Sequence, residues 1–122
     1  MENCVLGENV IIEKSKRFAV RIIRLYQKIT KNQHEYNLSV QLLRSGTSIG
    51  ANVKEATQGQ SRADFISKMY IALKEASETE YWLELLKETD YISIDDFLSL
   101  NSDCKELIKL LTSIIKSSKE KK

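Results

Sequence analysis

Proline is absent from this chain of 122 residues, and glycine occurs only four times. Because these two residues interrupt helices and form tight turns, their scarcity favours long continuous helices. Two cysteines without a short spacing do not indicate a disulfide framework or a zinc knuckle. No apolar run approaches the roughly 18 to 20 residues that span a bilayer, and the acidic Glu2 stands where a signal peptide would be basic. We therefore expect an all-α cytoplasmic protein that does not enter a membrane.

Residues for catalysis are also scarce, because histidine occurs only once. His34 alone cannot provide the Glu-x-x-His motif that a helical di-iron site needs on each of two helices, nor the H-E-x-x-H motif of a metalloprotease. No glycine-rich phosphate loop is present. Residues 113–116 match the S-x-x-K motif, but the Ser-Asp-Asn and Lys-Thr-Gly elements that accompany it in β-lactamases are missing. We therefore expect no enzymatic activity, no metal and no cofactor.

The chain does contain many apolar residues in helical spacing, three and four positions apart. With 42% apolar residues and a mass of 14.0 kDa, it has the size of one domain with its own core. The spacing predicts helices over residues 9–31, 36–59, 61–89 and 93–115, within a single domain whose ends, 1–8 and 116–122, are frayed. The third and fourth helices each open with a Ser-x-x-Asp sequence that has the form of a capping box. Short connections favour antiparallel neighbours, so we expect an up-and-down four-helix bundle.

Each expected helix has an apolar stripe that should face the core. The stripe residues are Ile11, Phe18, Ile22, Leu25, Tyr26 and Ile29, then Leu38, Leu42, Ile49 and Val53, then Phe65, Met69, Ala72, Ala76, Leu83 and Leu86, and finally Leu100, Cys104, Leu107, Leu111 and Ile114. The second helix carries an additional apolar line, made of Tyr36, Val40, Leu43 and Ala51. A helix that is apolar over more than half its circumference should be covered on two sides. Gly46 and Gly50 lie between the two lines, where small residues would let another backbone come close.

The segment RSGTSIGANVKEA at residues 44–56, followed by SRADFISKMYIALKEASETEYWLELL at 61–86, resembles the bacterial four-helix-bundle family of 23S rRNA intervening-sequence proteins. The resemblance covers about residues 9–111, although Ala56 stands where many members have glycine. It implies an antiparallel helical bundle that assembles into small rings, commonly pentamers, with a poorly defined biochemical role. A related group, the accessory variability determinant proteins of diversity-generating retroelements, acts as a basic oligomeric partner of a reverse transcriptase and its RNA.

The clearest charge feature is a row of basic residues, three and four positions apart, along the first expected helix. Its members are Lys14, Arg17, Arg21, Arg24, Lys28 and Lys31. Residues 10–32 hold seven basic residues and one acidic residue, a charge of +6, whereas the whole chain carries +2 and the remainder therefore −4. Such a row suits contacts with phosphates, so nucleic acid is one expected partner, and the resemblance favours RNA. The other interpretation is a solvated side of the helix whose charges pair with acidic residues such as Glu75, Glu78 or Glu84 of a neighbouring helix or subunit.

Some apolar residues remain outside the core stripes. The apolar residues are Val20, Ile23, Ile71, Trp82 and Leu85. Exposed together they would exceed the apolar patch of a usual soluble monomer, so we expect a homo-oligomer with Trp82 as an interface anchor. The alternative is that neighbouring helices cover them.

Glu80 leans toward the core, where we expect it to meet Arg44.

Two functions follow from these features. The first is a non-enzymatic accessory factor that binds RNA or other nucleic acid through the basic row; it is oligomeric, and the family resemblance implies a pentamer. The second is a protein interaction scaffold that touches no nucleic acid, with a nucleic-acid-processing protein among its possible partners.

Overall fold

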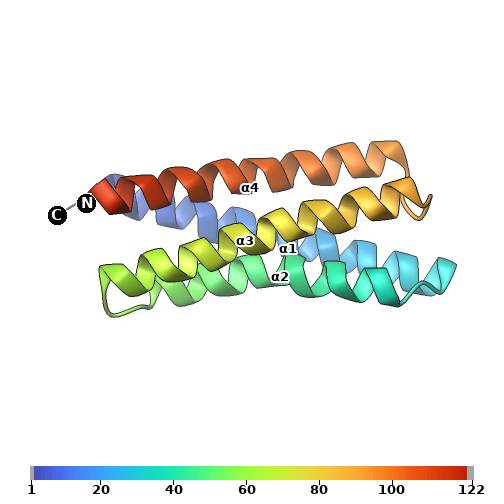
Figure 1. The fold of residues 1–122 in the computed structure, drawn as a ribbon, viewed down its shortest axis with the longest axis horizontal. Helices are drawn as coiled ribbons and strands as arrows, with labels where there is room; N and C mark the ends of the chain where they lie inside the picture. Colours follow the sequence, from blue (N-terminus) through green and yellow to red (C-terminus); the bar gives the residue numbers. More distant parts are fainter. Residues whose placement is uncertain (1, 121–122) are drawn as a thin grey trace.

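The structure is a computed structural model that describes residues 2–120, with side chains from residue 7 onward. Within this range the chain forms α1 (Glu2–Gln33), α2 (Asn37–Thr57), α3 (Arg62–Glu88) and α4 (Ile94–Glu120). Figure 1 shows successive helices running in opposite directions, so the start of α1 and the end of α4 lie at the same end of the molecule. The expected all-α, up-and-down bundle is confirmed.

Each helix packs against two neighbours. α1 and α3 both pack against α2 and α4, whereas in the diagonal pairs α1–α3 and α2–α4 no Cα atoms of the described residues lie within 8 Å of each other. The α2–α3 contact is the most extensive, and the α1–α4 contact is the sparsest. The bundle therefore has four outer faces, each formed by one pair of neighbouring helices and named below by that pair.

The core is built from the predicted stripes. Among its fully buried side chains are Ile11, Phe18, Ile22, Leu42, Ile49, Met69, Leu83, Leu107 and Leu111. Burying each of them contributes roughly 1.5 to 3 kcal/mol. Four predicted core residues at the margins are only half-buried, namely Tyr26, Leu38, Phe65 and Ile114.

The second apolar line of α2 is not covered, which corrects the expectation from its sequence. Tyr36 is 56% exposed and Val40 is 43% exposed, while Ala51 is exposed and Leu43 half-buried. The reason is that α1 and α3, the two neighbours of α2, pack on its other sides. Among the described residues, no other part of the chain covers this side.

α1 and α2 approach closely at two glycines, as the sequence predicted. A Cβ placed on Gly46 would lie 2.9 Å from both γ-carbons of Ile22. One placed on Gly50 would lie 3.3 Å from Ser15 Oγ and 3.4 Å from the carbonyl oxygen of Ser15. Each glycine lowers helix propensity by about 1 kcal/mol relative to alanine, so close packing explains why both are tolerated.

Side chains satisfy free backbone N–H groups at three helix starts. The N–H of Asp64 donates to Ser61 Oγ at 3.1 Å and that of Asp96 to Ser93 Oγ at 3.0 Å, which confirms both predicted caps. α2 is capped instead by Glu35, whose carboxylate accepts from the first three N–H groups of the helix at 2.8 to 2.9 Å. We did not predict this cap, because glutamate is not among the preferred N-cap residues.

α1 and α4 are longer than the sequence spacing predicted. The structure places residues 2–8 in α1 and residues 116–120 in α4, where we expected frayed ends. Residues 1, 121 and 122 lie outside the described part. The two helices contact each other near these ends, since a Cβ on Gly7 would lie 3.8 Å from Ile114 Cγ1. No helix within residues 2–120 is long and apolar enough to cross a membrane.

Candidate interaction surfaces

The basic row of α1 separates into two rows in the structure. Lys14, Arg21 and Lys28 are seven residues apart, nearly two helical turns, and lie along the α1–α4 contact. Their ion pairs are Lys14–Glu106 at 3.1 Å, Arg21–Asp103 at 2.5 Å and Lys28–Asp96 at 3.6 Å. This half of the row, here called the seam row, is therefore neutralised by carboxylates of α4. It links the two helices whose contact is sparsest.

The other half of the row points away from α4. Arg17, Arg24 and Lys31, here called the outer row, are exposed and again seven residues apart. Arg17 pairs with Glu13 at 2.9 Å, but these side chains are 69% and 71% exposed, so the pair contributes little. Arg24 donates to the side chain of Gln27 at 3.5 Å. Within residues 7–120, neither Arg24 nor Lys31 has a carboxylate partner.

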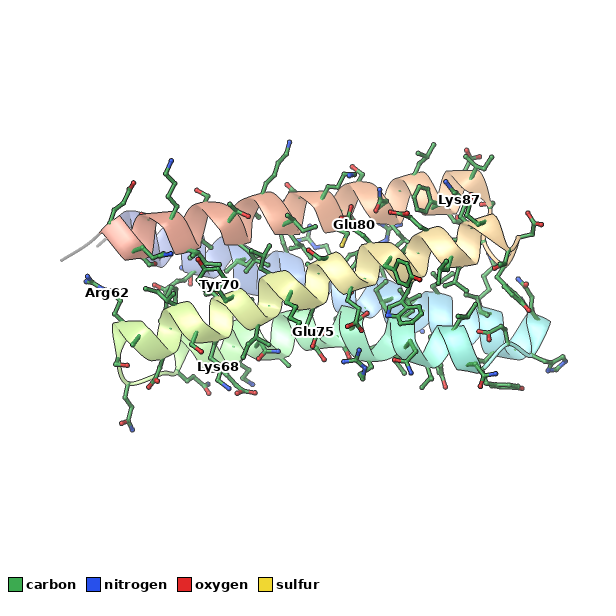
Figure 2. The ribbon with its side chains drawn as sticks, viewed as in Figure 1. Arg62, Lys68, Tyr70, Glu75, Glu80 and Lys87 are labelled. Atoms are coloured by element: carbon green, nitrogen blue, oxygen red, sulfur yellow. The ribbon has the colours of Figure 1, made fainter. Side chains whose placement is uncertain are left out.

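Glu75 and Glu78, two of the α3 carboxylates that the alternative interpretation placed beside the basic row, pair with α2, because α1 and α3 lie on a diagonal. Arg44 of α2 pairs with Glu75 at 3.5 Å and also with Glu78. Glu80 pairs with Lys105 of α4 at 3.3 Å, so the expected Arg44–Glu80 pair is wrong. Figure 2 shows Glu75 on the α2 side of α3 and Glu80 on the α4 side. Positions five residues apart differ by about 140° around a helix, which separates their partners.

The predicted interface residues lie on α1 and α3, which are diagonally opposite in the bundle. Val20 and Ile23 of α1 are 47% and 38% exposed, and Ile71 of α3 is 39% exposed. Trp82 and Leu85, also on α3, are half-buried. Because α1 and α3 are diagonal, these five side chains do not form one continuous patch.

Trp82, the predicted anchor, is already held by its own helix. Its indole N–H donates to Glu78 Oε2 at 3.2 Å, one turn away. Its ring meets the ring of Tyr81 edge to face, with centroids 5.3 Å apart. A partner at this position would therefore meet a ring whose polar atom is already bonded.

A broader apolar surface lies on the α1–α2 face. The Gly46–Ile22 and Gly50–Ser15 contacts show which sides of the two helices meet. By helical spacing, the residues that follow around each helix, away from the core, include apolar residues on both, beside the exposed Lys16 of α1 and Lys54 of α2. These apolar residues are Ile12, Val20, Ile23, Val40 and Leu43, here called the apolar face; all are exposed except Leu43, which is half-buried. The uncovered second line of α2 was the sequence signal for this surface, but the contribution of Ile12 was missed.

The histidine and the described cysteine lie in different surroundings. His34 is exposed in the α1–α2 connection, with Nδ1 3.4 Å from Tyr36 Oη. Cys104 is buried, its thiol donates to the carbonyl oxygen of Ala76 at 3.2 Å, and burial raises its pKa to about 12. Between residues 7 and 120, no three His, Cys, Asp or Glu side chains are grouped as metal ligands.

Comparisons with known proteins agree with this architecture. Residues 7–113 match the family described as 23S rRNA-intervening sequence protein. The chain belongs to this family. It is also similar to a crystal structure from Bacteroides thetaiotaomicron VPI-5482, described as a protein of unknown function from the S23 ribosomal protein family. The two are 59% identical over 90% of this chain and 98% of that one, with a TM-score of 0.89. No curated protein matches the sequence.

Proposed function

We propose that this member of the 23S rRNA-intervening sequence protein family is a non-enzymatic, cytoplasmic scaffold that assembles with copies of itself through the apolar face. The observation that carries the proposal is the exposure of that face. Ile12, Ile23, Val40 and Val20 are between 37% and 47% exposed on one side of the bundle. Burial of apolar area contributes roughly 25 cal/mol per Å², so covering these side chains favours association.

Self-association explains features that a monomer leaves unexplained. The second apolar line of α2 has helical spacing but stays largely uncovered by the residues that the structure describes, and a second copy would cover it. Residues on the outer sides of two adjacent helices form an elongated surface, which suits packing against the helices of another bundle. The resemblance to ring-forming relatives favours five copies.

Light scattering after gel filtration tests the scaffold. We expect the wild-type chain to have a multiple of the 14.0 kDa chain mass, five-fold by the resemblance. The double variant Ile23→Glu/Val40→Glu places two charges in the apolar face and should give a monomer. The matched control, Leu98→Glu, changes a residue of α4 that is 59% exposed and should leave the mass unchanged. A monomeric wild-type chain, or a double variant that keeps the assembly, would contradict the proposal.

A second candidate function, nucleic-acid binding by α1, is supported by the outer row. Arg24 and Lys31 are exposed without a carboxylate partner among the described residues, and the family description refers to 23S rRNA. The seam row contributes less, because phosphates would compete there with Glu106, Asp103 and Asp96. Three phosphate contacts per subunit give a salt dependence of about −2 in log K against log salt for a single strand. Repetition of the outer row around an assembly would increase the number of phosphate contacts and, with it, the salt dependence.

Two double variants, each of which removes two positive charges, distinguish nucleic-acid binding through α1 from a scaffold that binds no nucleic acid. Arg24→Gln/Lys31→Gln removes two charges from the outer row, and Lys14→Gln/Lys28→Gln removes two from the seam row. We expect the first to reduce retention on immobilised RNA at low salt and the second to leave it nearly unchanged. Equal retention of both variants and wild type would exclude binding through the outer row. A protein partner would survive nuclease treatment in a pull-down, whereas an RNA-mediated partner would be lost.

A further inference from the structure

The α3–α4 face carries a second group of cations, and this one includes exposed aromatic rings. Tyr70 and Tyr81 of α3 are 45% and 55% exposed, and they are eleven residues apart, about 16 Å along the helix. The lysines of this face are Lys74 on α3 and Lys105, Lys109, Lys116 and Lys119 on α4. The basic residues of α4 share this side of the helix, whereas its paired acidic residues, Asp96, Asp103 and Glu106, face α1.

Only one of these five lysines is in an ion pair with a carboxylate among the described residues. Lys105 is paired with Glu80 at 3.3 Å, between α3 and α4 (Figure 2). Lys74, Lys109 and Lys116 are exposed and have no carboxylate partner among residues 7–120. By contrast, half of the α1 row is paired with α4. The α3–α4 face therefore offers more unpaired positive charge than the outer row of α1.

A groove lies between α3 and α4 beside these lysines. It has a volume of about 350 Å³, and its lining includes Tyr70, Leu73, Ile115, Lys116, Lys119 and the single acid Glu120. Lys119 Nζ donates to Tyr70 Oη at 3.1 Å and lies 5.4 Å from the ring centroid, which holds the ring beside the groove. Figure 2 shows Tyr70 between the two helices. Apolar and aromatic surface thus adjoins cationic groups at one site.

We infer that this surface, defined by Tyr70, Lys74, Lys109, Lys116 and Lys119, binds single-stranded nucleic acid. A base enters the groove against Tyr70, and the adjoining phosphates meet the lysines. Stacking on an aromatic ring is available only to unpaired bases, because bases in a duplex already stack on each other. Lysines near the end of a helix also stabilise its dipole, but that role requires neither the groove nor an exposed tyrosine.

This inference goes beyond the proposed scaffold and is compatible with it. The apolar face uses α1 and α2, so it leaves the α3–α4 face of each subunit open. An assembly would therefore display several copies of the surface around its outside, and a strand crossing neighbouring subunits would bind more tightly than one subunit allows.

Fluorescence anisotropy with a labelled, unstructured RNA of about 20 nucleotides tests the site, with the same RNA annealed to its complement as the comparison. Lys109→Gln/Lys116→Gln should weaken binding of the single strand at least tenfold and make its salt dependence shallower by about 1.4 in log–log slope. Arg24→Gln/Lys31→Gln, with the same charge change on α1, should weaken it less. Tyr70→Leu should weaken single-strand binding about tenfold and leave duplex binding within twofold, since it removes stacking and no charge.

The outcomes separate the two surfaces. A larger loss in the α1 variant than in the α4 variant would overturn the inference and support the outer row instead. Equal effects of Tyr70→Leu on single strand and duplex would overturn the stacking site, and so would absence of RNA binding by the wild-type chain at low salt. Helicity by circular dichroism and mass by light scattering confirm that each variant is folded and assembled like the wild type. The scaffold proposal does not depend on any of these results.

Discussion

Replacing Gly46 by alanine tests whether α1 and α2 are held at a distance set by this glycine. The added Cβ would lie 2.9 Å from both γ-carbons of Ile22, about 0.6 Å closer than the shortest favourable carbon contact. Ile22 is fully buried, and side chains in a close-packed core have little room to move. Overpacking of this kind costs about 1 to 3 kcal/mol, and the gain in helix propensity offsets about 1 kcal/mol of it. We therefore expect a net loss of about 1 kcal/mol in unfolding free energy.

Gly7→Ala is the matched control, because the same change is made in a helix with space around it. Its Cβ would lie 3.8 Å from the nearest atom, Ile114 Cγ1, which is ordinary contact. We expect this variant to gain up to about 1 kcal/mol from helix propensity alone. The two substitutions should therefore change stability in opposite directions. Urea unfolding followed by far-UV circular dichroism measures both, at one protein concentration so that assembly does not alter the comparison.

A double-mutant cycle identifies the clashing atoms. Ile22→Ala removes both γ-carbons, so its combination with Gly46→Ala should be less destabilising than the sum of the single variants, by about 0.5 to 3 kcal/mol. Ile22→Val keeps both γ-carbons and should show almost no such coupling. Additivity in the alanine cycle, or stabilisation by Gly46→Ala alone, would refute the close-packing explanation for this glycine.

Three further predictions concern other parts of the bundle. Burial acts to raise the pKa of Glu35, but the N–H donors of Leu38, Ser39 and Asn37 and the Ser39 hydroxyl outweigh it and lower that pKa. Its stabilisation is therefore present above the ordinary glutamate pKa and lost as pH falls through the lowered value. Glu35→Gln should be less stable than wild type by about 1 kcal/mol at neutral pH, and this gap should close in acid; a gap independent of pH in urea titrations would disprove the cap. Arg21 and Asp103 should show a coupling of about 0.5 to 1 kcal/mol in an alanine cycle, weakened by salt, because both side chains are partly exposed; zero coupling at low salt would argue against the seam. In a Cys4→Ser background, the Cys104 thiol should react with Ellman's reagent at least 100-fold more slowly than after denaturation, since it is buried and its pKa is raised to about 12; equal rates would show that the core opens freely there.

The fold could be predicted because its signals are local. Apolar residues three and four apart mark the core side of each helix. In the stripe expected for α3, every residue is buried except Phe65, which is half-buried. Ser61 and Ser93 act on N–H groups three residues away, so their caps are visible in the sequence. The Glu35 cap was not predicted, because its long side chain reaches the backbone N–H groups of α2 in a conformation that no short sequence motif indicates.

The interaction surfaces were harder to predict because they depend on which helices are neighbours. The basic row of α1 is continuous in sequence, yet α4 neutralises alternate members of it. Glu75 and Glu80 are close in sequence but meet different helices. Val20 and Trp82 were grouped by their apolar character, although the helices that carry them lie on a diagonal.

By itself, the sequence determined four amphipathic helices, their antiparallel order and most of the residues in the core, because helical periodicity and capping act within a few residues. Only the tertiary structure decided which charges are paired, which apolar residues stay exposed, and that tyrosines and lysines meet on the α3–α4 face. Those outcomes depend on the order of the helices around the bundle, which brings together side chains that are far apart in the chain.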